Sequence, residues 1–360
     1  MVALDSEEFS PGAKPVKHDK AKAAAEEVDL SGKVLNDRYQ IFEKIGEGGY
    51  GAVYRAQQLK VGRQCAVKVL HASTARHATV IARFRREAKA ASNLKDGHTI
   101  QVFDFDQTPD GNFFLAMEMV TGRSALMELR GGPLSTARVA HIVDGIAQSL
   151  GEAHALGIVH RDIKPENIYL DRRIGDDDYP KVLDFGTVKF ASGSILDGGE
   201  VLTGVGQTIG TIEYMSPEQI TGGTLDGRSD LYSLGVMAFE MLTGTLPFTG
   251  ATSQKIAAAH LTEPPPVPSE RAPQLGIPPA MDAIVLKLMA KKKADRYLTA
   301  ADLQRDVRRL VPRATKPEAI AAAPPTLPVA RGPSRTTLLI IAAVLVSILI
   351  AIVWRIGAGP

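Results

Sequence analysis

The sequence predicts an α+β fold that ends in a membrane-spanning helix, and three observations support this prediction. Apolar residues at alternate positions lead into a glycine-rich turn at 46–51, which indicates a strand on either side of the turn. Amphipathic helices are predicted at 79–95 and 139–150, where apolar residues recur at helical spacing. Near the C-terminus, residues 336–354 carry no charge and are mostly Leu, Ile, Val and Ala.

The glycine-rich turn contains Gly46, Gly48 and Gly51 and follows an apolar strand start at 39–45. Residues without a Cβ let backbone N–H groups approach phosphate oxygens closely. Taken alone, the turn is equally well explained as a glycine-rich hairpin that binds nothing. The order strand, glycine loop, strand argues against a dinucleotide-binding fold, in which the glycine loop leads into a helix.

One lysine, Lys68, is embedded in the short apolar run 66–70. On its own this run would suit a surface lysine on an edge strand. In the helix predicted at 79–95, however, Glu87 lies on the apolar face and points inward. A buried carboxylate needs a cation, and Lys68 is the natural candidate. We therefore expect Lys68 and Glu87 to form an ion pair.

A polar loop follows the helix predicted at 139–150. Asp162 in this loop is placed to accept or orient a substrate hydroxyl proton, and Lys164 can neutralise charge on a moving phosphoryl group. Asn167 and, further along the chain, Asp184 supply hard oxygen ligands of the kind that magnesium takes. A solvated turn is the alternative, but the flanking runs GIVHRD and NIYL are apolar and favour a buried, pre-organised loop.

Six short motifs occur in an order that identifies a family. They are IGEGGYGAVYRA (45–56), CAVKVL (65–70), HRDIKPEN (160–167), LDFG (183–186), GTIEYMSPE (210–218) and SDLYSLG (229–235). With this set the chain resembles a bacterial eukaryotic-like (Hanks-type) serine/threonine protein kinase of the membrane-anchored kind. The resemblance covers residues 39–311. It implies the two-lobed protein kinase fold, with a small β-rich N-lobe (39–120) and a larger helical C-lobe (121–311).

The resemblance implies an enzyme that needs ATP and Mg²⁺ and transfers the γ-phosphate of ATP to Ser or Thr hydroxyls of proteins. Asp162 would be the catalytic base, with Lys164 at the γ-phosphate. Lys68, held by its glutamate, would contact the α- and β-phosphates, and Asn167 and Asp184 would bind magnesium. The residues implied to bind ATP are Ile45, Gly46, Gly48, Gly51, Val53, Ala66, Lys68, Met117, Glu118, Val120 and Tyr169.

Four residues are implied to support the site. Asp230, at the head of the apolar helix LYSLGVMAFEML, would brace the catalytic loop, and Glu218 would pair with Arg296. Arg161 precedes the catalytic base and would face the activation segment, where a phosphate could neutralise its charge.

Three threonines of the activation segment (187–216) are candidates for regulation or substrate alignment. Thr211 would contact the catalytic Asp and Lys, as the family pattern implies. We expect autophosphorylation at Thr203 or Thr208 to order the segment, the alternative being that both are ordinary loop residues.

Two other functions were weighed against a protein kinase. A pseudokinase that acts as a nucleotide-responsive scaffold would usually lack one of Lys68, Asp162 and Asp184, and all three are present. A kinase of small molecules such as aminoglycosides would not be expected to retain GTIEYMSPE, a segment that docks peptide substrates.

Composition limits the partners. The net charge of +2 on 360 residues gives no case for nucleic-acid binding, and the basic run 291–293 suits a solvated face. The single cysteine, Cys65, excludes an intrachain disulfide framework, fits a reducing compartment and is expected to be a small core residue.

The ends of the chain predict a membrane anchor. Residues 1–38 form a charged extension without the apolar core of a secretory signal, and 312–335 is a Pro/Ala-rich linker. As a helix, 336–354 would span roughly 28 Å, close to the thickness of a bilayer's hydrocarbon core. With the short tail 355–360, this predicts a single-pass protein of the cell membrane whose kinase domain is cytoplasmic, either tail-anchored or truncated. A homodimer formed through the anchors is left open.

Overall fold

The structure is a computed structural model that describes residues 29–48, 51–70, 88, 91–185 and 209–310. All of these residues belong to one compact unit. The predicted linker, membrane-spanning helix and tail lie outside the described residues, as does most of the predicted N-terminal extension. Within the described part of the chain, no helix is both long and apolar enough to cross a membrane.

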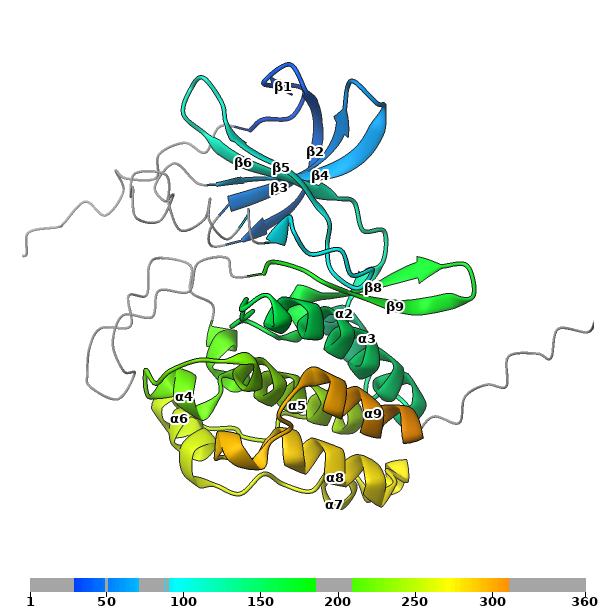
Figure 1. Ribbon diagram of the computed structural model, residues 1–360, viewed down its shortest axis with the longest axis vertical. Helices are drawn as coiled ribbons and strands as arrows, with labels where there is room; N and C mark the ends of the chain where they lie inside the picture. Colours follow the sequence, from blue (N-terminus) through cyan, green and yellow to red (C-terminus); the bar gives the residue numbers. More distant parts are fainter. Residues whose placement is uncertain (1–28, 49–50, 71–87, 89–90, 186–208, 311–360) are drawn as a thin grey trace, which may run out of the picture. The chain divides into compact units, whose positions relative to one another are not determined.

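An antiparallel six-stranded sheet forms the first part of the fold (Figure 1). One face of the sheet is apolar, because alternate residues of each strand point to the same side and these residues are apolar. On this face Tyr39 and Phe114 make an edge-to-face contact. Cys65 is a free, buried thiol in this core, as predicted, and burial raises its pKa. In spatial order the strands are β1 (Val34–Leu35), β2 (Tyr39–Gly48), β3 (Gly51–Gln58), β4 (Arg63–Leu70), β6 (Phe113–Glu118) and β5 (Val102–Gln107).

A second, three-stranded sheet is joined to the segment before β5. It consists of β7 (Arg123–Ser124), β8 (Ile168–Arg173) and β9 (Asp176–Val182). Thr99 forms an isolated parallel bridge with Val182 of β9. On either side of this bridge, the Val182 N–H donates to the His98 carbonyl (2.7 Å) and the Ile100 N–H donates to the Val182 carbonyl (2.9 Å). The strand that leads to Asp184 is therefore fixed by backbone hydrogen bonds to the segment before β5.

Helices make up most of the remaining described chain (Figure 1). The helix predicted at 139–150 is confirmed and is longer, because Ser135 caps its first turn. The helix predicted at 79–95 falls largely outside the described residues. The α-helices are α2 (Ala125–Leu129), α3 (Thr136–Ala155), α4 (Pro217–Ile220), α5 (Gly227–Thr243), α6 (Ser253–Thr262), α7 (Pro268–Arg271), α8 (Pro279–Leu288) and α9 (Ala300–Leu310), and the 3₁₀ turns are η2 (Pro165–Asn167), η4 (Ile209–Tyr214), η5 (Pro273–Leu275) and η6 (Lys293–Asp295).

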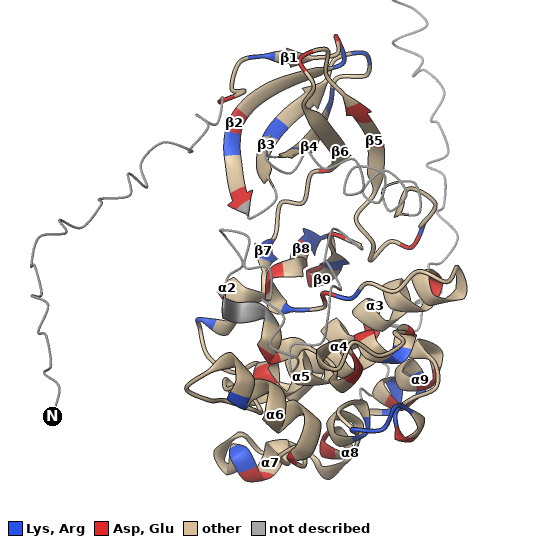
Figure 2. Ribbon diagram, turned by 90° about the vertical axis from the view of Figure 1, so that its left-hand side faces the viewer, with Lys and Arg blue, Asp and Glu red and all other residues tan. Residues whose placement is uncertain are grey.

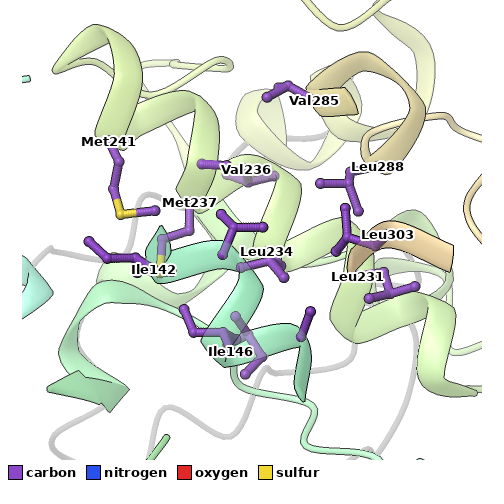
Figure 3. Close-up of a cluster of buried hydrophobic side chains, with 14 of the residues drawn as sticks. Ile142, Ile146, Leu231, Leu234, Val236, Met237, Met241, Val285, Leu288 and Leu303 are labelled. Carbon is purple, nitrogen blue, oxygen red and sulfur yellow. The ribbon is translucent and has the colours of Figure 1, made fainter. Parts of the chain in front are cut away.

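The helical core is built around α5, which is buried over nearly its whole length. Figure 3 shows Ile142 and Ile146 of α3 beside Leu234 and Met237 of α5, and all four are buried. Each apolar side chain of this size contributes about 1.5–3 kcal/mol when it is removed from water. Helix α5 is thus a firm support for any group attached to its first turn.

The prediction that Lys291 belongs to a solvated basic face is wrong. Its ammonium group donates to the carbonyl oxygens of His260 (2.8 Å) and Ala259 (3.2 Å) and lies over the ring of Phe248. Burial lowers the pKa of Lys291 to about 8. His260 is itself fully buried, with its Nδ1 2.9 Å from the hydroxyl of Tyr232. Burial and the nearby Lys291 charge lower the pKa of His260 to about 4.

Candidate active site

The loop between α3 and η2 is hydrogen-bonded to Asp230, in the first turn of α5. The Asp230 carboxylate accepts hydrogen bonds from the backbone N–H groups of His160 (2.8 Å) and Arg161 (2.7 Å). His154 of α3 also contacts it, at 2.8 Å from Nε2 to Oδ2. The side chain of Asp230 is 1% exposed, so these contacts replace its hydration. The loop is therefore attached directly to the helical core.

Two residues of the site have left-handed backbone conformations although neither is glycine. Arg161 has φ +69° and Asp184 has φ +51°. Such a conformation costs on the order of 1–3 kcal/mol for a residue with a Cβ, and it persists only where surrounding contacts impose it. One strained residue thus precedes Asp162, and the other is Asp184 itself.

Asp162, Lys164 and Asn167 lie together in this loop. The Asn167 side-chain amide donates to the Asp162 carbonyl (2.8 Å) and to Asp162 Oδ2 (3.1 Å), while Lys164 Nζ lies 3.4 Å from the same Oδ2. With Nδ2 used in this way, Asn167 Oδ1 has no donor among the described residues. The Lys164 ammonium group and the Asn167 amide nitrogen thus meet at one carboxylate oxygen of Asp162.

Lys68 reaches this site from the six-stranded sheet. It is 8% exposed on β4, and its ammonium group lies 2.7 Å from Asp184 Oδ2. Glu87, its predicted partner, lies outside the described residues. The partner that the structure describes for Lys68 is therefore the carboxylate predicted to bind magnesium. Asp184 Oδ2 and Asn167 Oδ1 are hard oxygen donors, and this donor set fits a divalent cation such as Mg²⁺.

The predicted phosphate-covering glycines lie at the ends of β2 and β3. Gly46 pairs with Val53, and Gly48 pairs with Gly51. A Cβ added to Gly51 would lie 2.0 Å from the Val69 carbonyl oxygen, so glycine is needed here for close packing of β3 on β4. A Cβ on Gly46 would meet nothing closer than 3.9 Å. The requirement for glycine at 51 is therefore set by the sheet itself.

Four of the residues implied to bind ATP share one apolar cluster. They are Val53, Ala66, Met117 and Val120. Ile45, by contrast, is 45% exposed and Tyr169 lies on β8, and neither belongs to this cluster. The backbone N–H of Glu118 donates to the Gln101 carbonyl (2.8 Å), so this group is already used within the protein.

The predicted Glu218–Arg296 pair is present and buried. Arg296 forms two hydrogen bonds to the Glu218 carboxylate, of 2.7 and 2.9 Å, and Ser229 adds a third of 2.6 Å. Burial alone would raise the pKa of Glu218, but the hydrogen bonds from Arg296 and Ser229 outweigh it and hold the pKa below its usual value. This pair ties α4 to the segment between α8 and α9.

Residues 39–306 match the family described as "Protein kinase domain". The chain belongs to this family. It is 44% identical over 270 residues to serine/threonine-protein kinase pkn3 of Myxococcus xanthus, a match that covers 75% of this chain and 49% of pkn3. It is 39% identical over 284 residues to serine/threonine-protein kinase PknB of Mycobacterium tuberculosis, with 77% of this chain and 43% of PknB covered. The chain thus spans less than half the length of these curated relatives.

A solved structure supports the same family. The PknI kinase domain of Mycobacterium tuberculosis aligns with a TM-score of 0.61 at 25% identity, over 78% of this chain and 98% of that domain. The two-lobed kinase architecture predicted from the motifs is therefore confirmed: a β-sheet N-lobe precedes a helical C-lobe.

The activation segment is only partly described. Thr203 and Thr208 lie outside the described residues. Thr211 lies in η4, two residues before Glu213, and its side chain lies outside the described part of the structure, so its predicted contact with Asp162 and Lys164 stays a prediction. Burial raises the pKa of Glu213 and of Glu240, and the hydroxyl of Tyr214 donates to Glu240 at 2.5 Å.

Sequence reasoning missed a buried lysine that contacts Glu118, one of the residues implied to bind ATP. Lys181 of β9 is 2% exposed and lies 2.6 Å from Glu118 Oε2 and 3.3 Å from the Thr99 carbonyl. Arg173 approaches the other oxygen of Glu118 at 3.9 Å. Figure 2 shows this mixture of acidic and basic residues around β8 and β9. The signal was available, because Lys181 is embedded in an apolar run just as Lys68 is.

Proposed function

We propose that this chain is an ATP- and magnesium-dependent serine/threonine protein kinase. The observation that carries the proposal is a pair of neighbouring contacts: Lys68 of β4 meets Asp184, and Asn167 holds Asp162 within the loop. The Leu183 N–H donates to the Asn167 carbonyl at 2.9 Å and so links the two contacts, and Asp230 anchors the loop on α5. Membership of the protein kinase family and the similarity to serine/threonine-protein kinases support protein Ser/Thr hydroxyls as acceptors.

In this reaction the oxygen of a Ser or Thr hydroxyl forms a bond to the γ-phosphorus of ATP. The bond between the γ-phosphorus and the β–γ bridging oxygen breaks, and ADP leaves with that electron pair. Asp162 accepts the hydroxyl proton, and Lys164 neutralises charge on the moving phosphoryl group. Lys68 binds the nucleotide phosphates that remain with ADP.

Asn167 and Asp184 are the residues that would hold magnesium. When bound, the cation neutralises charge on the phosphate oxygens. Asn167 also orients Asp162 through its amide, at 3.1 Å from Oδ2. Asp230 keeps the loop in its strained conformation, so that Asp162 needs no rearrangement to take up the proton.

We further propose that the enzyme acts at the cell membrane. The charge-free span at 336–354 supports a single-pass anchor, and the need for ATP supports a cytoplasmic kinase domain. Autophosphorylation at Thr203 or Thr208 would create a partner for Arg161, whose side chain is exposed. A homodimer formed through the anchors would bring two activation segments within reach of each other.

The test uses the full chain in detergent micelles with ATP and Mg²⁺, beside an Asp162→Asn control. We expect mass spectrometry to find phosphothreonine in the activation segment and phosphate transfer to a generic protein substrate, both reduced to a small residual level in the control. Nucleotide binding without transfer in the unaltered chain would instead favour a scaffold. Transfer to an aminoglycoside but to no protein would favour a small-molecule kinase.

A further inference from the structure

Arg161, the left-handed residue before the proposed catalytic base, has hydrogen bonds on both of its peptide groups. The N–H of Arg161 donates to Asp230, at 2.7 Å. The Arg161 carbonyl oxygen accepts a hydrogen bond from the side-chain amide of Gln219, at 2.8 Å. Gln219 lies 58 residues further along the chain, in α4. A left-handed backbone at a residue with a Cβ persists only where surrounding contacts impose it, and here both peptide groups of Arg161 are hydrogen-bonded.

The second of these peptide groups leads directly to Asp162. Its carbonyl belongs to Arg161 and its N–H to Asp162, and that N–H donates to His160 Nδ1 at 3.2 Å. Both polar atoms of the peptide are therefore fixed, one of them by Gln219. Rotation of this peptide would turn the Cα–Cβ bond of Asp162 and move its carboxylate.

Gln219 can hold the peptide because its own amide is oriented. Its Oε1 accepts from the N–H of Ser216 (2.9 Å) and from the Ser216 hydroxyl (3.1 Å), and together with the Gln219 N–H these contacts form a capping box at the start of α4. With Oε1 facing two donors, Nε2 is left to face the Arg161 carbonyl. Only an amide can do both, because a carboxylate would keep the cap but could not donate.

We propose that Gln219 is a positioning residue for Asp162, joining the cap of α4 to the catalytic loop. The inference rests on the proposed kinase function and deepens it. The position of α4 and the orientation of the catalytic carboxylate are then coupled through this side chain.

The test compares Gln219→Glu with Gln219→Leu in the full chain in detergent. Gln219→Glu keeps an acceptor for Ser216 and so should retain the thermal midpoint, but it loses the donor to Arg161. We expect its kcat to fall about tenfold with KM for ATP changed less than about twofold, since small misplacements of a catalytic group cost rate more than binding. Gln219→Leu should lose both kcat and thermal stability.

Two controls separate positioning from general destabilisation. Thr252→Ala removes the side-chain cap of α6 (3.3 Å to the Lys255 N–H), away from the loop, and should lower the thermal midpoint without lowering kcat. In an Asp162→Asn background, Gln219→Glu should have no further effect on the residual rate, because there is no longer a carboxylate to aim.

A measurement independent of catalysis completes the test. Hydrogen–deuterium exchange of residues 158–168 should be about tenfold faster in Gln219→Glu than in the unaltered chain and unchanged in Thr252→Ala. Faster exchange in a chain that transfers no phosphate would retain the positioning role and reject the kinase function. Unaltered exchange or unaltered kcat in Gln219→Glu, or a fall in kcat matched by an equal effect of Thr252→Ala, would overturn the inference.

Discussion

Replacing Glu118 should lower the free energy of unfolding more than replacing Lys181, although the two side chains form one ion pair. The Lys181 side chain is 2% exposed, whereas that of Glu118 is 25% exposed. Glu118→Gln would leave a buried ammonium group with the Thr99 carbonyl at 3.3 Å and no carboxylate. Removing one partner of a buried pair in this way costs about 3–5 kcal/mol.

Lys181→Met should lower the free energy of unfolding much less than Glu118→Gln does. Glu118 keeps water and the guanidinium of Arg173 at 3.9 Å, so its charge is not stranded. We expect a loss of about 1–2 kcal/mol from the missing hydrogen bonds. In the double variant the stranded ammonium group is gone, so it should be about 2 kcal/mol more stable than Glu118→Gln alone.

The assay is denaturant unfolding of the full chain in detergent, followed by far-ultraviolet circular dichroism. Lys44→Met is the matched control, because Lys44 pairs with Glu47 on the surface with both side chains more than 40% exposed. That variant should lose less than about 1 kcal/mol. If Glu118→Gln costs no more than Lys181→Met, the reasoning from unequal burial is refuted.

Three further predictions concern single residues. Lys68→Met should lower kcat/KM for ATP by about 100-fold in a radiolabel transfer assay, because one preorganised charge on the phosphates is lost. Gly51→Ala should cost about 3 kcal/mol in denaturant unfolding, since its Cβ would lie 2.0 Å from the Val69 carbonyl oxygen, whereas Gly46→Ala should cost less than about 1 kcal/mol. Acid should destabilise the fold through His260: its pKa is about 4 when folded and 6.5 ordinarily, so the unfolded chain binds more protons between these values. Stability should therefore be fully present above pH 6.5 and fall by about 2 kcal/mol between pH 7.5 and pH 5, a fall that His260→Gln should reduce in unfolding curves.

Each of these has an outcome that would contradict it. Transfer by Lys68→Met at more than a tenth of the normal rate would remove that lysine from the phosphate site. Equal stabilities of Gly51→Ala and Gly46→Ala would mean that β3 and β4 adjust at no cost. An identical loss of stability at pH 5 with and without His260 would assign the acid sensitivity to other groups.

Functional residues that lie close together in the sequence could be predicted from it. The loop from His160 to Asn167 is one example, because its charged residues lie between apolar runs that predict burial. The brace from Asp230 and the pair of Glu218 with Arg296 followed from the family pattern, and the structure shows both contacts.

Contacts that depend on how distant segments pair could not be predicted. Lys181 meets Thr99 only because β9 bridges the segment before β5, 82 residues away. Gln219 donates to the carbonyl of Arg161, whose backbone is left-handed. No local sequence pattern predicts this backbone conformation. The partial burial of Lys291 could not be predicted because a run of three lysines looks solvated, whereas the first of them turns toward carbonyl oxygens in the last turn of α6.

The anchoring of the loop has a consequence for how the site can open and close. Asp162 and Asn167 are carried by α5 through Asp230, while Lys68 belongs to β4 of the other sheet. Among the described residues, Lys181 of β9 also pairs with Glu118, at the end of β6 close to the connection between the two parts. A hinge movement at this connection would therefore lengthen the Lys68–Asp184 contact most directly and leave the loop's internal contacts unchanged. That single interatomic distance would serve as a coordinate along which open and closed populations could be followed, for example by spin labels placed on β4 and α5.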